Sequence, residues 1–575
     1  MNNLLRYTSD KEGVRILVDV LARKGVRRVV LSPGSRNAPL LMTFARNQKI
    51  RYYVVLDERS AAFMALGMAQ QSGEPVALAC TSGTAALNYG PAIAEAYYQR
   101  LPLIVITADR PEEWIDQEDS QTIRQNGLFA NVVKGSWQLP AEPADEEGRW
   151  YVNRLANEAV NCAMRGRRGP VHVNVPLREP LYRQCACPEE QPRIVELVDA
   201  APVLSPEALS DLTHRWKACR KVMILAGFQL PEPRLKACLH RLAVWEQVVV
   251  LTETPSNLGT ERHIGTIDRV LATIREEEKP AFAPDLLISF GGSLISRQVK
   301  TFLRQNPPRE HWYVDQSELP ADTFKALTAQ INLKAVDFFD LLEKNMTSVS
   351  SDYADRWRRK KETATVCHDG FARQTGWCDW KAFSLILPSI PEGAALQLAN
   401  STPVRYAQLF ECPQVGRVDC NRGTSGIDGS VSTAVGAAAL NAGLTVLVTG
   451  DMSFLYDSNA LWNKYISPCL KIIVMKNGGG GIFRFIPGPS ELPELEECFE
   501  TACEVNVKGF ADLHRFRYFQ AANAEELQSV LPSFWQESEA PALLAVETPG
   551  PLNADVLKAY FRQLSDADND HVPLG

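Results

Sequence analysis

Short apolar runs with the composition of buried strands recur along this chain, and segments of helical character separate them. In the N-terminal third, such runs occupy residues 29–31, 52–55, 76–80, 103–106 and 171–175. Further runs occupy residues 221–225, 248–252, 286–290, 312–314, 445–449 and 471–475. Strands of a parallel sheet are buried on both faces, and strands that alternate with helices form doubly wound sheets. The sequence therefore predicts an α/β protein of this type.

Polar residues follow two of these runs directly. Gly450-Asp451-Met452-Ser453 follows the run at 445–449, and Lys476-Asn477-Gly478-Gly479 follows the run at 471–475. A connecting helix at residues 459–467 would make the two strands parallel neighbours, with both polar segments at one edge of the sheet. Ligands bind at this edge in open α/β sheets.

The two polar segments predict a magnesium–diphosphate site. Mg²⁺ prefers hard oxygen ligands, which the Asp451 carboxylate, the Asn477 amide and the Gly479 backbone carbonyl would supply. Ser453 can donate a hydrogen bond to a phosphate oxygen. A helix-capping aspartate or a glycine-rich turn would explain either segment alone, but the two together at this spacing favour the metal site.

The same segments resemble the thiamine diphosphate motif, in which Gly-Asp-Gly is followed by Asn-Asn. Met452 and Gly478 depart from this motif, and neither departure removes a metal ligand. Other segments resemble the 2-succinyl-5-enolpyruvyl-6-hydroxy-3-cyclohexene-1-carboxylate synthase family (MenD) along the full chain. These segments are residues 32–36, 57–59, 107–111, 123–125, 421–429 and 455–457, and the stretch Asn-Arg-Gly-Thr-Ser-Gly-Ile-Asp-Gly at 421–429 is the most specific.

The resemblance implies three doubly wound parallel-sheet domains of the thiamine-diphosphate-enzyme type. They are a pyrimidine-binding domain at residues 1–188, a central Rossmann-like domain at 195–345 and a diphosphate-binding domain at 356–575. Polar segments at 187–193 and 343–361 are expected to link them. The central part lacks a convincing Gly-x-Gly-x-x-Gly, so we expect no bound dinucleotide there.

The implied activity belongs to menaquinone biosynthesis. Members of this family are cytoplasmic, use thiamine diphosphate with Mg²⁺ or Mn²⁺, and join 2-oxoglutarate to isochorismate with loss of carbon dioxide. A homodimer or homotetramer with its active site between subunits is also implied.

The resemblance assigns catalytic roles to Glu58, Gln121 and Ile427. Glu58 lies between the run at 52–55 and a predicted helix of small residues at 60–69. A carboxyl in an apolar setting keeps its proton readily and can share it with the pyrimidine nitrogen of the cofactor. A helix-start carboxylate stabilised by the helix dipole is the structural alternative for this residue. Ile427 would hold the cofactor in its bent form, and Gln121 would serve the substrate or an ordered water.

Binding roles are implied for a larger set of residues. The expected cofactor contacts are Glu58, Ser401, Ile427, Gly450, Asp451, Met452, Ser453, Asn477, Gly479, Ile482 and Phe483, with Asp451, Asn477 and Gly479 on the metal. Both implied substrates are dianions, and planar guanidinium groups bind carboxylates through paired hydrogen bonds. The expected substrate contacts are Arg36, Arg110, Gln121, Arg297, Ser401, Arg405 and Arg422.

Composition narrows the function classes only slightly. The net charge of −7 argues against a nucleic-acid partner, and no apolar run reaches the ~18 residues of a membrane span. The thirteen cysteines show no pairing scheme or zinc spacing, which is typical of reduced thiols.

Two alternatives to the implied activity remain open. One is another thiamine diphosphate enzyme, a 2-oxoacid decarboxylase or an acetohydroxyacid-synthase-like lyase. The other is a non-catalytic nucleotide-binding α/β protein, for which Glu58 would have no use.

Overall fold

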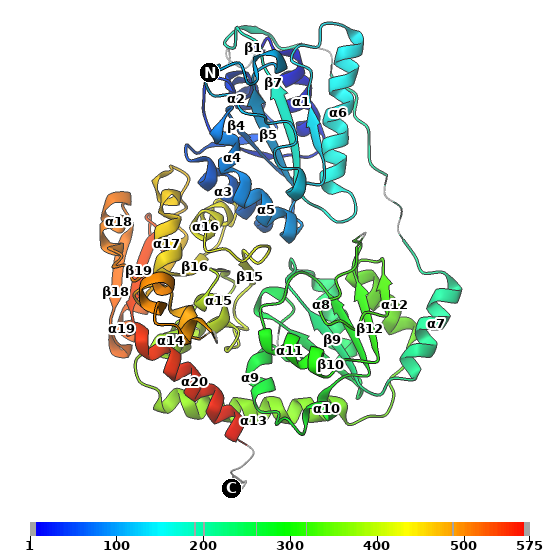
Figure 1. Cartoon of the computed structure of the whole chain (residues 1–575), viewed down its shortest axis with the longest axis vertical. Coiled ribbons are helices and arrows are strands. Elements are labelled where there is room, and N and C mark those ends of the chain that lie inside the picture. The colour runs from blue at the N-terminus through cyan, green and yellow to red at the C-terminus, as the bar shows by residue number, and fades with distance from the viewer. Residues whose placement is uncertain are drawn as a thin grey trace. The chain divides into compact units, whose positions relative to one another are not determined.

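The chain folds around three parallel sheets of six, five and six strands, which confirms the predicted fold class (Figure 1). The computed structural model describes residues 7–188, 191–198, 200, 202–259, 261–317, 319–485 and 488–567. Among these residues, no helix is both long enough and apolar enough to cross a membrane.

The first sheet has the strand order β3-β2-β4-β5-β7-β6, and all neighbouring strands run parallel. Its strands are β2 Arg28–Leu31, β3 Arg51–Val54, β4 Val76–Cys80, β5 Leu103–Asp109, β6 Ser136–Gln138 and β7 Val171–Pro176. The accompanying helices are α1 Glu12–Arg23, α2 Ala38–Arg46, α3 Glu58–Ser72, α4 Thr84–Asn88, α5 Gly90–Gln99 and α6 Glu146–Met164. Separately, β1 Tyr7–Ser9 pairs antiparallel with β8 Gln184–Ala186.

Helix α1 illustrates how the sequence pattern produces this packing. Val14, Leu17, Val18 and Leu21 recur at helical spacing, and all four side chains are buried in the core of this sheet. An apolar stripe of this kind directs one face of a helix towards the sheet.

The second sheet is also parallel, with the order β10-β9-β11-β12-β13. Its strands are β9 Val222–Ala226, β10 Val248–Thr252, β11 Leu286–Phe290, β12 Glu310–Val314 and β13 Ala329–Ile331. The accompanying helices are α7 Pro206–Lys217, α8 Pro233–Leu242, α9 Ile267–Ala272, α10 Lys279–Phe282, α11 Arg297–Gln305 and α12 Ala335–Asn345.

The third sheet has the order β15-β14-β16-β17-β19-β18. Its strands are β14 Ala395–Leu398, β15 Arg417–Cys420, β16 Thr445–Gly450, β17 Leu470–Lys476, β18 Arg517–Ala521 and β19 Ala542–Glu547. The helices of this region are α13 Tyr353–Gln374, α14 Asp379–Ser389, α15 Thr402–Ala407, α16 Ser430–Ala438, α17 Asp451–Tyr456, α18 Val507–His514, α19 Ala524–Trp535 and α20 Gly550–Asp566.

Two local expectations were wrong. No helix spans the expected residues 459–467. The connection between β16 and β17 instead contains α17, Asp451–Tyr456, followed by a short 3-10 turn at Ser458–Trp462. Asn463 accepts a hydrogen bond from the backbone of Tyr465 (2.9 Å), a local bond that competes with helix formation. The linker expected at 343–361 is largely helical, because α13 buries Tyr353 and Trp357 one turn apart.

The described residues form two compact units. One lies within Met1–Ala200, Asn421–Thr445 and Tyr456–Leu470, and the other lies within Ala201–Cys420, Val446–Leu455 and Lys471–Gly575, in each case over the described residues alone. The domain boundaries given above stay predictions.

Helices α3 and α16 pack closely within the first unit, and glycines allow the approach. A Cβ atom added at Gly67 would lie 2.0 Å from the backbone oxygen of Thr433. A Cβ atom added at Gly436 would lie 2.0 Å from the backbone oxygen of Met64. Neither backbone atom can turn aside as a flexible side chain could, so any side chain at these glycines must push the helices apart.

We expect Gly436→Ala to lower the thermal denaturation midpoint, because overpacking of this kind costs about 1–3 kcal/mol. Gly370→Ala is the matched control, since Gly370 lies within α13 and its added Cβ would meet only the Gln563 amide nitrogen at 3.7 Å. Alanine is favoured over glycine in helices by about 1 kcal/mol, so the control should raise the midpoint. Equal shifts in both variants would contradict this account of the helix contact.

Candidate functional site

The third sheet changes direction of winding between β14 and β16, which lie side by side although β15 and two helices, α15 and α16, separate them in the chain. Crevices form at such points, beyond the carboxyl ends of the strands. Ser401 follows β14, and Asp451 follows β16. Asn477 follows β17, the next strand of the same sheet, so the sequence-predicted metal ligands lie at one sheet edge.

Asp451 is buried and is held by backbone donors from its own turn and from the loop after β17. Its Oδ1 accepts a hydrogen bond from the Met452 backbone (2.8 Å), and its Oδ2 accepts one from the Gly478 backbone (3.0 Å). Burial raises the pKa of this carboxyl, and the backbone hydrogen bonds oppose that rise. The carboxylate is therefore fixed in place and brings the two predicted segments together.

Asn477 is held by a second buried carboxylate, Asp379, which sequence reasoning missed. The Asn477 Nδ2 donates to Asp379 Oδ2 over 2.9 Å, and the Thr548 hydroxyl donates to Asp379 Oδ1 over 2.5 Å. Burial raises the pKa of Asp379, and the bonds from Thr548 and Asn477 lower it. A single aspartate at the start of α14 carries no recognisable motif, so no local signal could have identified it.

The glycines around these ligands leave room for a bound group. Gly478 and Gly479 have φ values of 86° and 121°, which side-chain-bearing residues rarely adopt. Nothing lies within 4 Å of a Cβ atom added at Gly450 or Gly478. Open space beside a fixed carboxylate and an amide oxygen fits a divalent cation with a diphosphate. Met452 and Ser453 begin the turn after Asp451, and the Ser453 side chain is buried.

Ile482 and Phe483 lie in a short 3-10 turn, Gly481–Arg484, that is tied to the segment Leu495–Glu500. Arg484 forms two hydrogen bonds with the Glu500 carboxylate, of 2.5 and 2.6 Å. The rings of Phe483 and Phe499 lie 5.5 Å apart. The side chains of Ile482 and Phe483 are half-buried.

Ser401 directly precedes the first residue of α15, and Arg405 lies within this helix. Ser401 has a φ of 72° without being glycine, a strained conformation that often marks a functional site. The positive charge of Arg405 lowers the pKa of the buried Asp268 carboxyl, although burial is the larger effect and raises it. Arg405 therefore lies near a carboxylate of α9. Arg297 is exposed at the first residue of α11.

In the other unit, Glu58 is the first residue of α3, and its side chain is half-buried at the end of β3. Burial raises the pKa of Glu58, and the charge of Asp57 adds to that rise. The charge of Glu58 also raises the pKa of Cys80 and Tyr89, whose larger cause is burial. Burial therefore opposes ionisation of Glu58, and a backbone hydrogen bond to its carboxyl partly offsets this effect.

The start of α3 is anchored to the last residue of α17 and to the segment that follows it. Asp57 caps the helix by accepting from the Ser60 backbone (3.1 Å), and it also accepts from the Asn459 amide. Arg59 donates to the Tyr456 backbone oxygen (2.7 Å), and its guanidinium lies 4.8 Å from the centre of the Tyr456 ring. These contacts fix the backbone on both sides of Glu58.

Asp457 is a buried carboxyl in the same region. It accepts hydrogen bonds from the Ser432 backbone (2.6 Å) and the Ser432 hydroxyl (2.8 Å) at the start of α16. Burial raises the pKa of Asp457 to about 7, while the Ser432 bonds and the charge of Arg59 lower it and the charge of Asp57 raises it. The folded protein therefore binds this proton more tightly than the unfolded chain does.

We expect the folding stability of Asp457→Asn relative to that of the wild type to increase progressively as the pH rises from about 4 to about 7. In this window the carboxyl is ionised in the unfolded wild type but still protonated in the folded wild type. The folding stability of the wild type therefore falls with rising pH, by at most about 1.4 kcal/mol per pH unit. The asparagine can still accept from the Ser432 backbone and has no such titration. Denaturation of both proteins across this range would measure the difference, and a difference independent of pH would contradict the assignment.

Arg36 and Arg110 lie close together after β2 and β5. Burial lowers the pKa of Arg36, and the positive charge of Arg110 lowers it further. Arg36 pairs with Glu179 (3.1 Å), and Arg110 pairs with Asp119 (2.8 Å). Two neighbouring guanidinium groups suit an anionic ligand.

Gln121 is positioned by its neighbour's contact with Arg110. Arg110 donates two hydrogen bonds, of 3.1 and 3.2 Å, to the backbone oxygen of Ser120. Gln121 itself is exposed, with a φ of 56°. The structure therefore brings Arg36, Arg110 and Gln121 together.

The loop that carries Arg422 and Ile427 is held by Glu95 of α5, a buried residue that sequence reasoning missed. Glu95 accepts from the backbone of Gly423 (2.6 Å) and from the backbone of Thr424 (2.7 Å). Arg422 is half-buried, and the Ile427 side chain is 41% exposed. Glu95 and Gly423 are 328 positions apart, so no sequence pattern links them.

His172 is a buried core residue of β7. Its ring nitrogens contact the hydroxyls of Thr107 (2.7 Å) and Ser136 (3.2 Å), and burial lowers its pKa to about 4.

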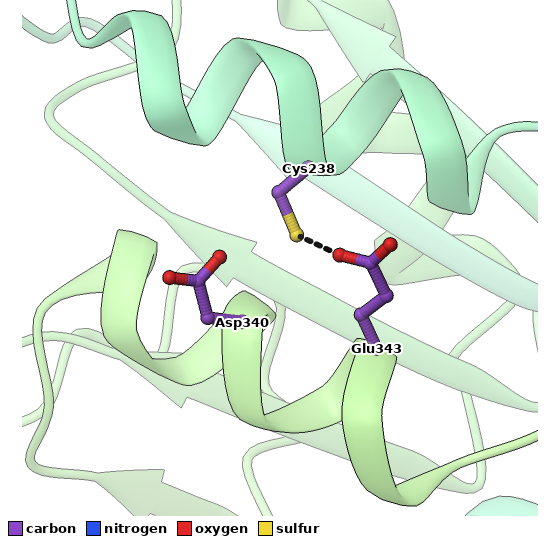
Figure 2. A group of neighbouring side chains, drawn as sticks. All are labelled: Cys238, Asp340 and Glu343. Atoms are coloured by element: carbon purple, nitrogen blue, oxygen red, sulfur yellow. Dashed lines mark hydrogen bonds between the residues drawn. The ribbon is translucent and has the colours of Figure 1, made fainter.

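Cys238, Asp340 and Glu343 form another cluster of potential metal ligands, between α8 and α12 (Figure 2). Each carboxylate already has a guanidinium partner, because Arg234 lies 2.6 Å from Asp340 and Arg241 binds Glu343 through two hydrogen bonds. The Cys238 thiol donates to Glu343, and burial raises the thiol's pKa to about 12. A protonated thiol is a poor metal ligand, so we interpret this cluster as a contact between two helices.

The predicted residues thus fall into two sets, one in each compact unit. Ser401, Arg405, Asp451, Ser453, Asn477, Gly479, Ile482 and Phe483 belong to the unit with the third sheet, together with Arg297. Arg36, Glu58, Arg110, Gln121, Arg422 and Ile427 belong to the unit with the first sheet.

Comparisons with known proteins concern nearly the whole chain. Residues 11–128 match the family described as thiamine pyrophosphate enzyme, N-terminal TPP binding domain. A protein of Porphyromonas gingivalis named 2-succinyl-5-enolpyruvyl-6-hydroxy-3-cyclohexene-1-carboxylate synthase is 49% identical over 566 residues, covering 97% of this chain and 98% of the relative. Proteins with the same name are 40% identical in Flavobacterium johnsoniae (96% of this chain, 98% of the relative) and 37% identical in Bacteroides thetaiotaomicron (97% and 99%).

Proposed function

The chain belongs to the 2-succinyl-5-enolpyruvyl-6-hydroxy-3-cyclohexene-1-carboxylate synthase family, and we propose that it joins 2-oxoglutarate to isochorismate with release of carbon dioxide. It is a thiamine diphosphate enzyme of menaquinone biosynthesis, with a cofactor-binding domain that includes residues 11–128. Identity of 49% across 97% of the chain is the observation that carries this conclusion.

Asp451, Asn477 and the Gly479 carbonyl would hold Mg²⁺ or Mn²⁺ against the diphosphate. The buried Asp451 carboxylate and the open space at Gly450 and Gly478 support this assignment. Met452 and Ser453 would border the diphosphate, and Ile482 and Phe483 would limit the access of water.

Glu58 would hold a proton at its carboxyl and share it with the pyrimidine nitrogen. Burial favours the protonated form of a carboxyl, and the raised pKa of Glu58 supports this role. Thiamine diphosphate, when bound, supplies the carbon nucleophile and electron sink of the reaction. Ile427 would press against the cofactor and fix its bent form.

The substrate carboxylates would be bound by guanidinium groups. Arg36 and Arg110 approach each other closely enough to lower the pKa of Arg36, which supports an anion site beside Gln121. Ser401, Arg405 and Arg422 would contact the substrates from the other motif loops, as would the exposed Arg297. The strained backbone at Gln121 and Ser401 supports functional roles for both residues.

Arg405→Ala and Arg422→Ala are each expected to raise KM or lower kcat/KM ~10- to 100-fold for at least one substrate. A guanidinium–carboxylate contact in a partly desolvated site is worth roughly 1.5–3 kcal/mol. Cofactor affinity and the thermal midpoint should stay near the wild-type values. Arg358→Ala is the control, because Arg358 pairs with Asp355 on an exposed face of α13. If the two site variants instead lose thermal stability with KM unchanged, Arg405 would be a structural partner of Asp268 and not a substrate ligand.

Incubation of the protein with both substrates, thiamine diphosphate and Mg²⁺ tests the proposed function directly. Mass detection of the succinyl-cyclohexene carboxylate product is the expected result. Carbon dioxide release that is the same with and without isochorismate would indicate a simple decarboxylase instead. A protein that binds no thiamine diphosphate would favour the non-catalytic alternative.

We also propose self-association, as a homodimer or homotetramer with the active site between subunits, and a cytoplasmic location. Exposed large apolar side chains in the unit with the first sheet support self-association, and they include Tyr52, Leu56, Leu87, Tyr98, Tyr456 and Trp462.

A further inference from the structure

We propose that Asp379 is a positioning residue that orients the side-chain amide of Asn477, so that the amide oxygen faces the metal. This inference rests on the proposed function, because it assumes that Asn477 binds the metal. It assigns a role to a residue outside all the motifs described above.

The contact has only one chemically sensible direction. An ionised carboxylate can only accept hydrogen bonds, so the amide group that faces Asp379 must be the nitrogen. The Asn477 Nδ2 lies 2.9 Å from Asp379 Oδ2. The amide oxygen therefore occupies the other branch of the planar group, on the side away from Asp379. Without this contact the amide could rotate by half a turn and present its nitrogen, which cannot bind a cation.

Asp379 is itself held rigidly. Its backbone N–H donates to the Asn553 side chain (2.8 Å), and its second carboxylate oxygen accepts from Thr548. The Thr548 backbone donates to the Lys476 carbonyl at the end of β17 (3.0 Å). The same network thus links the carboxylate to the strand that carries Asn477.

The backbone of Asn477 is confined as well. A Cβ atom added at Gly550, the first residue of α20, would lie 2.0 Å from the Asn477 carbonyl oxygen. With the main chain fixed against this helix, the side-chain rotamer is the remaining freedom of Asn477, and Asp379 removes it. Groups that orient metal ligands in this way typically change metal affinity by ~10- to 100-fold when they are replaced.

Asp379 could instead act by charge alone, as a second anion near Asp451. Substitution by asparagine separates the two effects. In Asp379→Asn the new amide oxygen can accept from Asn477, while its nitrogen donates to the Thr548 hydroxyl. The hydrogen bond is kept and the charge is lost. Asp379→Leu has a similar shape and loses both.

The experiment is titration of Mn²⁺ into the full-length protein with thiamine diphosphate, followed by electron paramagnetic resonance. We expect Asp379→Leu to weaken Mn²⁺ binding at least ~10-fold and Asp379→Asn to stay within ~2-fold of the wild type. Asp512→Leu makes the same change at an exposed carboxylate of α18 that pairs with Lys508, and it should stay near the wild type. Equal losses in both Asp379 variants would overturn the orientation proposal in favour of charge.

A double-variant cycle adds a test that a merely structural role would not pass. Asn477→Ala removes the proposed ligand, so Asp379→Leu should weaken Mn²⁺ binding no further in that background. Additive losses would contradict the proposal. If the wild type itself binds neither Mn²⁺ nor thiamine diphosphate, the proposed function fails, whereas unchanged Mn²⁺ binding in Asp379→Leu sinks the inference alone.

Discussion

Glu58→Gln should bind thiamine diphosphate with near-normal affinity and lose ~10²- to 10⁴-fold in kcat, the range typical of a missing general acid or base. Glutamine preserves the size of the side chain and its hydrogen bonding to the pyrimidine, but it cannot exchange a proton with the ring nitrogen. Burial raises the pKa of Glu58, so its surroundings disfavour the ionised carboxyl relative to water. Calorimetry would measure cofactor affinity, and product formation at saturating substrate would measure kcat.

Glu74→Gln is the matched control for this variant. Glu74 lies just beyond the other end of α3, where it pairs with Arg28 over 2.6 Å, and it undergoes the same chemical change far from the start of the helix. It should retain wild-type turnover. Full activity in Glu58→Gln would remove the basis for placing the pyrimidine ring beside this residue.

The second large effect is expected from Asp451→Ala, which should weaken the binding of metal and thiamine diphosphate together by more than ~100-fold. The metal bridges the protein and the diphosphate, so loss of its carboxylate ligand affects both equilibria. The substitution also leaves the backbone donors of Met452 and Gly478 without their acceptor. Mn²⁺ titration with and without cofactor would measure the coupling.

Asp512→Ala serves as the control for the metal-site variant, because Asp512 is exposed on α18 and pairs with Lys508. It should bind both ligands like the wild type. Loss of metal affinity with unchanged cofactor affinity in Asp451→Ala would contradict a metal–diphosphate bridge.

The strands of this protein were predictable because parallel strands are buried on both faces. The runs at 248–252 and 286–290 coincide with β10 and β11. The strands β16 and β17 extend the runs expected at 445–449 and 471–475 by one and two residues. The candidate metal site followed from the same reasoning, since Asp451 and Asn477 come directly after two strands that lie side by side. Local composition is sufficient for features of this kind.

Features that depend on distant residues were not predictable. Asp379 is 98 positions from Asn477, and Glu95 is 328 positions from Gly423, yet each holds a motif loop in place. The helix expected at 459–467 did not form, because local side-chain bonds compete with it there. The linker expected at 343–361 was wrong because the charged run at 356–361 resembles a linker in sequence. These charged residues belong to α13, which buries Tyr353 and Trp357.

The glycine contact between α3 and α16 restricts how this polypeptide can be divided or recombined. All nine residues of α16 are buried, and the helix packs against α3, which lies more than 350 positions earlier in the chain. A fragment that begins at residue 356 would expose this surface to solvent. In a chimera that takes its two ends from different relatives, α3 and α16 would come from different proteins. The close packing at Gly67 and Gly436 would then be lost wherever the partner backbone differs. These two helices therefore have to be inherited as a pair, whatever crossover point joins the segments between them.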